Sequence, residues 1–97
     1  MYYEAELHRL EGELRLRLDP RDEQRAEASF RRALDIARVQ EAKSWELRAA
    51  TSLARLWAEQ RRRGEARELL APVYGWFAEG FDTADLKDAN TLLGELS

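Results

Sequence analysis

The chain has no cysteine, and its 97 residues include only two prolines and five glycines. The absence of cysteine excludes disulfide bonds, thiol catalysis and thiolate-bound metal ions. Valine and isoleucine together account for only three residues, so the residue types that favour β-strands are scarce. Alanine, leucine, glutamate and arginine dominate instead, and all four favour helices. These scarcities indicate an all-α protein.

Long apolar runs are also missing. No stretch approaches the roughly 20 apolar residues that a membrane-spanning helix requires. The first residues, Met1-Tyr2-Tyr3-Glu4, lack the basic and apolar regions of a signal peptide. We therefore expect a cytoplasmic protein without a membrane partner.

Neither sign of charge forms a block. Sixteen basic and 19 acidic residues alternate along the chain and give a net charge of −3. This pattern is typical of solvated helix faces that carry ion pairs between neighbouring turns. A nucleic-acid-binding domain would present a basic face, so we expect no nucleic-acid partner.

One pattern of apolar residues occurs twice. Ala26, Phe30 and Ala33 have the spacing i, i+4, i+7, and the same spacing returns forty positions later at Ala66, Leu70 and Val73. Another amphipathic stretch precedes each trio: first Leu7, Leu10 and Leu14, then Ala50, Leu53, Ala54 and Trp57. A duplicated helix–turn–helix unit of this length is typical of a helical repeat scaffold.

The pattern predicts one domain over residues 1–97 with five helices. Their expected ranges are 3–18, 22–40, 44–62, 65–78 and 83–96. Pro20 interrupts the first junction. Ser44 is expected to cap the start of the third helix, and Gly64 its end in a left-handed conformation.

The first helix carries a stripe of leucines. Leu7, Leu10, Leu14 and Leu18 share one face at helical spacing, which we interpret as the core face. Leu16 lies off that stripe. The helix is therefore expected to be apolar on two sides, as in a helix packed between neighbours.

The two hairpins resemble tetratricopeptide repeats. Ala50, Leu53, Ala54 and Trp57 match the family's first helix, and Ala66, Leu70 and Val73 match its second, with valine for the usual alanine. The resemblance implies an α–α superhelix with a first repeat over about 3–41, a second over about 43–79, and a capping helix over about 83–96. It also implies protein or peptide binding without catalysis or cofactors.

Two segments resemble the C-terminal ends of large bacterial signalling regulators. These are residues 4–14 and 70–86. Such regulators join an adenylate cyclase-like or DNA-binding domain to a nucleotide-binding ATPase and a long repeat array. The resemblance implies that this chain is the last two repeats and the cap of such a protein.

The resemblance also implies a concave groove that could hold a peptide. Its residues would be Arg48, Thr51, Arg55 and Glu59 in the second repeat, and Ala5, His8, Gly12 and Arg15, within one residue of register, in the first. Arg48 and Arg55 could bind a peptide carboxylate through paired hydrogen bonds. A solvated helix face is the alternative.

Two other functions are weighed against this interpretation. His8, with Glu4 and Glu11 on the same face, offers three metal ligands, but one histidine on a charged helix is more typical of a surface residue. Arg61-Arg62-Arg63 or the Arg48/Arg55 groove could bind a nucleotide or another anion, which would make the chain a small regulatory domain.

Two repeats are fewer than the roughly three that such arrays need for stability. We therefore expect the first helix to present an apolar face that drives homodimerisation. Leu16, Tyr2 and Tyr3 are the residues predicted to form that face.

Overall fold

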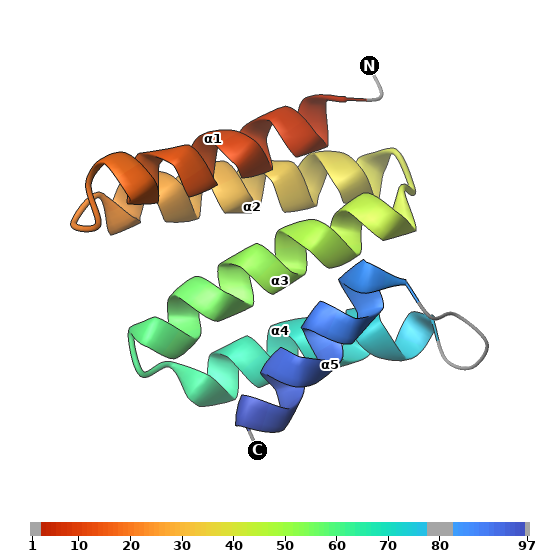
Figure 1. Cartoon of the computed structure of the whole chain (residues 1–97). Helices are drawn as coiled ribbons and strands as arrows, with labels where there is room; N and C mark the ends of the chain where they lie inside the picture. Colours follow the sequence, from red (N-terminus) through yellow and green to blue (C-terminus); the bar gives the residue numbers. More distant parts are fainter. Residues whose placement is uncertain (1–2, 78–82, 97) are drawn as a thin grey trace.

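The computed structural model describes residues 3–77 and 83–96, and within them every regular element is a helix (Figure 1). The five helices are α1 (Glu4–Leu18), α2 (Glu23–Val39), α3 (Lys43–Glu59), α4 (Arg63–Trp76) and α5 (Ala84–Leu96). The predicted all-α class is confirmed, and every helix start and end lies within two residues of expectation except the end of α3, which comes three residues earlier.

Helices that follow one another in the chain also pack against one another. α1 and α2 lie alongside each other, as do α3 and α4 (Figure 1). α3 contacts both helices of the first pair, and α5 packs across α3 and α4. α3 is therefore the central helix, and α1 and α5 lie on opposite sides of it.

The core follows the duplicated pattern. Phe30 and Leu70, the large residues of the two trios, are fully buried. Ala26 and Ala33 flank Phe30, and Ala66 and Val73 flank Leu70. Leu86, Ala89, Leu92 and Leu96 complete the core from α5. These repeated side chains hold the helices in fixed positions.

α1 turns a face of small residues toward the core. Ala5 and Gly12 are buried, and a methyl group added at Gly12 would lie 2.6 Å from Cε1 of Phe30. The Phe30 ring therefore occupies the space that a side chain at Gly12 would need. Leu16 also packs against the core from this face.

The interpretation of the leucine stripe as a core face is wrong. Leu7, Leu10, Leu14 and Leu18 are all exposed. The assignment of Leu16 to the open face is wrong for the same reason, because Leu16 lies half-buried on the opposite side of the helix. Gly12 and Ala5 decide the orientation, since only the face that carries them can approach α2 closely.

The two loops that flank α3 share one conformation. Glu41 and Arg61 have φ values of 54° and 64°, in the left-handed region. The next backbone N–H, of Ala42 or Arg62, donates 2.8 Å hydrogen bonds to a carbonyl five residues back. This bond closes the C-terminus of a helix.

Two predicted caps are misplaced. Gly64 is the second residue of α4, and Arg61 adopts the left-handed conformation in its place. Ser44 is the second residue of α3 and does not cap it. The Oγ1 of Thr83 accepts a 3.3 Å hydrogen bond from the Leu86 N–H and so caps α5.

Candidate functional site

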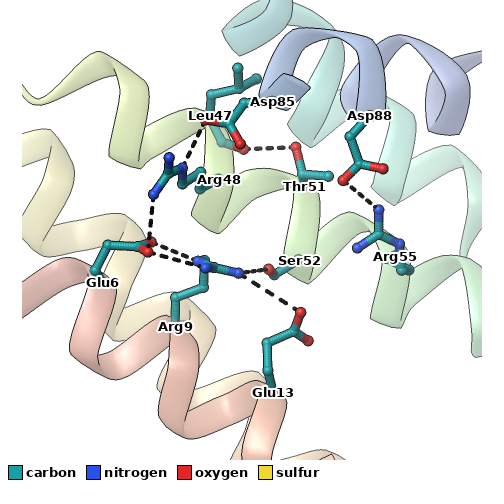
Figure 2. Close-up of polar contacts among 10 residues, drawn as sticks. All are labelled: Glu6, Arg9, Glu13, Leu47, Arg48, Thr51, Ser52, Arg55, Asp85 and Asp88. Atoms are coloured by element: carbon teal, nitrogen blue, oxygen red, sulfur yellow. Dashed lines mark hydrogen bonds and ion pairs between the residues drawn. The ribbon is translucent and has the colours of Figure 1, made fainter. Parts of the chain in front are cut away.

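The predicted groove residues of α3 face α5. Nε of Arg48 donates a 2.8 Å hydrogen bond to Oδ2 of Asp85, and Nη2 of Arg55 donates one of the same length to Oδ2 of Asp88 (Figure 2). Thr51 is buried between them, and its hydroxyl donates to the Leu47 carbonyl oxygen. Glu59 is exposed at the end of α3. α5 thus supplies carboxylates where a bound peptide was expected.

In α1 the groove begins at Arg9 rather than at His8. The Arg9 guanidinium is bound by both oxygens of Glu6, at 2.7 and 3.1 Å, and donates to the Ser52 hydroxyl of α3 at 3.4 Å (Figure 2). One residue is about 100° of helix rotation. The predicted register is therefore displaced by one residue.

Of the four residues predicted from α1, Ala5 and Gly12 are buried, and His8 and Arg15 face away from the groove. His8 lies 3.7 Å from Glu11, and Arg15 lies 4.0 Å from Glu11 and 3.6 Å from Asp22. Two of these three pairs join neighbouring turns of α1, and the third joins α1 to the start of α2. His8 and Arg15 are therefore not brought together with Arg48 and Arg55.

A cavity of about 130 Å³ lies among these side chains. It is lined by three arginines, two hydroxyl residues and two aspartates: Arg9, Arg48, Arg55, Thr51, Ser52, Asp85 and Asp88. It is the polar space between α1, α3 and α5, and we call it the arginine cavity.

Every arginine of the arginine cavity already faces a carboxylate. Arg48 bridges two of them, because its Nη1 also donates to Glu6 at 3.2 Å. The hydrogen bond from Arg9 lowers the pKa of Glu6, and the bond to Asp85 raises the pKa of Arg48. An incoming anion would have to compete with these carboxylates, so the cavity acts first as a junction that joins three helices.

Of the three consecutive arginines, the middle one makes contacts between helices. Arg62 donates to Glu65 at 2.8 Å and to Glu27 at 3.4 Å, and its guanidinium lies 4.6 Å from the centre of the Trp57 ring. Arg61 and Arg63 are exposed. The middle arginine therefore holds α2, α3 and α4 together.

The exposed leucines of α1 form the second candidate surface. Leu7, Leu10, Leu14 and Leu18 are 62%, 50%, 56% and 78% exposed. Tyr3, at 71% exposure, continues the row, and its ring lies 6.0 Å from that of Trp45. We call these five side chains the α1 stripe. Tyr2, predicted together with Tyr3 and Leu16 to form the self-association face, lies outside the described residues.

A surface hollow of about 450 Å³ runs beside the α1 stripe. It is lined by Leu10 and Leu14 and by three charged residues, Arg9, Glu13 and Arg17. Apolar side chains with a charged rim are the usual composition of a protein-binding surface. The stripe therefore has the features of a docking site.

The opposite end of the helix row is polar. The exposed positions of α5 include Lys87, Asp88, Asn90, Thr91 and Glu95, while its leucines point inward. An end of this kind resembles the capping element of a repeat array. The two ends of the molecule are thus chemically different.

Neither a metal site nor a membrane span emerges from the described ranges. Within residues 3–77 and 83–96, no group of three or more histidine, aspartate or glutamate side chains is placed to hold a metal ion. No described helix is long and apolar enough to cross a membrane.

Comparisons with known proteins give no family for this chain. No protein-family model, no curated protein and no solved structure matches it. The function must therefore be inferred from the two surfaces themselves.

The sequence missed the partners of the groove arginines. Arg48 and Arg55 are seven residues apart and so share a helix face, and Asp85 and Asp88 are three apart and share another. Matching these two pairs by charge could have placed α5 against α3. Nothing in the local pattern of α1 indicated that Arg9 would reach Ser52.

Proposed function

We propose that this chain is a non-catalytic protein-binding scaffold that docks partners on the α1 stripe. The observation that carries the proposal is the row of leucines exposed along the whole length of α1. Soluble proteins seldom leave such a contiguous apolar row uncovered. Helix α1 is held firmly behind it, so the row is a preformed ridge.

The tetratricopeptide resemblance supports the same function. In this proposal the two helix pairs are repeats of a right-handed α–α superhelix, and α5 is its cap. The ridge on α1 is then the face onto which a preceding helix pair of an array would pack, as α1 and α2 pack onto α3. By the same resemblance, we propose that the parent protein is a cytoplasmic bacterial signalling regulator.

The arginine cavity supports the alternative function, an anion- or nucleotide-binding domain, less well. Arg9, Arg48 and Arg55 converge on it, but Glu6, Asp85 and Asp88 already accept their hydrogen bonds. An anionic ligand gains little where the cations are already paired.

Selection of helix-forming peptides tests the proposed function. A displayed peptide library would be selected against the wild-type chain and against the double variant Leu10→Glu, Leu14→Glu. We expect amphipathic peptides to be enriched on the wild type and lost on the double variant, because two carboxylates would interrupt the α1 stripe.

The matched control is Val39→Glu. Val39 is 84% exposed and lies on α2, outside the α1 stripe. This variant should retain the selected peptides. Absence of enrichment on the wild type, or equal enrichment on the double variant, would overturn the proposal.

A further inference from the structure

Large apolar side chains are concentrated at one end of the molecule. Of the seven that are exposed among the described residues, five belong to the α1 stripe, and the others are Val39 and Trp76. The exposed face of α5 is polar. In a head-to-tail stack, the leucines of one copy would lie against the polar face of α5 of the next copy. The apolar surface that best complements the α1 stripe is therefore the α1 stripe of a second copy.

The charged residues beside the α1 stripe are ordered along the helix. The acids Glu4, Glu6, Glu11 and Glu13 all lie before the last turn of α1, which carries Arg15 and Arg17. Arg9 also lies in the acidic part, where it pairs with Glu6 and Glu13. This order complements the helix dipole. It also means that parallel copies would align like charges, whereas antiparallel copies would set the acidic part of one helix near the basic end of the other.

The geometry points to a second copy of this chain as the partner that covers the α1 stripe. The two α1 helices would pack antiparallel, with the twofold axis crossing them midway along α1, at the level of Gly12. This inference rests on the proposed function and names its partner. Leu7 would pack near Leu18 of the other copy, and Leu10 near Leu14. A twofold contact uses the same surface on both subunits, so the assembly closes at two chains.

The size of the surface sets the strength of this dimer. A helix of 15 residues is about 22 Å long. Contact through one such helix from each chain is smaller than the standard interface, which buries about 800 Å² per partner. We therefore expect a weak dimer that forms as the concentration rises.

Sedimentation equilibrium over a wide concentration range is the first test. The wild type should shift from monomer to dimer, Leu10→Glu with Leu14→Glu should stay monomeric, and Val39→Glu should behave like the wild type. A circular dichroism spectrum equal to that of the wild type would show that the double variant is folded. A wild type that is monomeric throughout would overturn the inference.

Cysteine pairing tests the direction of the helices, because the natural chain contains no cysteine. Variants Leu7→Cys and Leu18→Cys would be oxidised separately and as a mixture. Antiparallel packing predicts a disulfide between the two different variants and little product from either alone. Efficient linkage of each variant to itself would indicate parallel helices and overturn the inference.

The two proposals can fail separately. A monomeric wild type that still selects peptides through the α1 stripe would leave the scaffold function in place and remove the second copy as its partner. A monomeric wild type that selects no peptide would remove both.

Discussion

Gly12 determines how closely α1 approaches α2. A Cβ at this position would lie 2.6 and 2.9 Å from two ring carbons of Phe30, whose side chain is fully buried. Overpacking of this kind costs about 1–3 kcal/mol. Substitution of alanine for glycine within a helix recovers about 1 kcal/mol. The clash outweighs the gain because the ring has no exposed space into which to move.

Gly12→Ala is therefore expected to lower the stability of the fold by up to about 2 kcal/mol. The matched control is Gly94→Ala in α5, where an added Cβ meets no atom within 4 Å. That change should raise stability by about 0.5–1 kcal/mol. Urea unfolding of the two variants measures both effects, and a stabilised Gly12→Ala protein would contradict the close approach of α1 and α2.

Arg61 adopts a conformation that favours glycine. Its φ of 64° places Cβ against the backbone, a strain of about 1–2 kcal/mol for residues other than glycine. Arg61→Gly would relieve this strain, but it would also give the unfolded chain more freedom, which offsets part of the gain. We therefore expect a net stabilisation of about 0.5–1 kcal/mol. Arg63→Gly, at the first residue of α4, should instead destabilise it or leave it unchanged. Thermal unfolding of the two variants would distinguish them, and equal effects would argue against the left-handed loop.

At the scale of the element, Glu6 of α1 pairs with Arg9 of the same helix and with Arg48 of α3, and these ion pairs depend on pH. The hydrogen bond from Arg9 is the largest cause of the lowered pKa of Glu6. Because the folded pKa lies below the usual 4.5, the contribution of Glu6 to stability is complete above pH 4.5 and is lost as the pH falls through the lowered value.

We therefore expect Glu6→Gln to be less stable than the wild type at neutral pH. The difference should narrow as the solution is acidified below pH 4.5, because the wild-type carboxylate becomes protonated. Urea midpoints measured at a series of pH values would follow this convergence. A constant difference across the acid range would mean that Glu6 acts through packing alone.

The sequence predicts α2 to α5 better than α1. In α2 and α4 the apolar residues occupy one face, as at Phe30 and Leu70, so periodicity alone determines which side is buried. In α1 the leucines mark one face and the small residues Ala5 and Gly12 another. Hydrophobicity favours the first face, whereas steric fit against Phe30 selects the second. Phe30 lies 18 residues after Gly12, so the local pattern of α1 does not contain it.

The candidate site was predicted only in part for a related reason. The resemblance to tetratricopeptide repeats indicated Arg48 and Arg55, but their partners come from α5, more than 30 residues later. Tertiary pairing of charged side chains has no periodic signal in the sequence. The one-residue displacement from His8 to Arg9 likewise reflects the rotation of α1 that Gly12 permits.

At the scale of the whole molecule, equivalent leucines at the two ends should respond differently to truncation. Leu92 of α5 is 5% exposed, whereas Leu14 of α1 is 56% exposed. We expect Leu92→Ala to cost about 2–5 kcal/mol and Leu14→Ala to change the stability of the monomer by no more than about 0.5 kcal/mol. Denaturant unfolding at low protein concentration measures both, and a large loss for Leu14→Ala would place that side chain in the core.

Arg48 links the first and last helices of this short row directly. Its guanidinium holds Glu6 of α1 with one nitrogen and Asp85 of α5 with another. Proteins built from stacked repeats ordinarily lose their terminal units one at a time, because each unit touches only its neighbours. Here the first and last helices share one cation, so fraying at either end withdraws a contact from the other. Amide protons at the two ends should therefore exchange with solvent in a correlated way rather than independently.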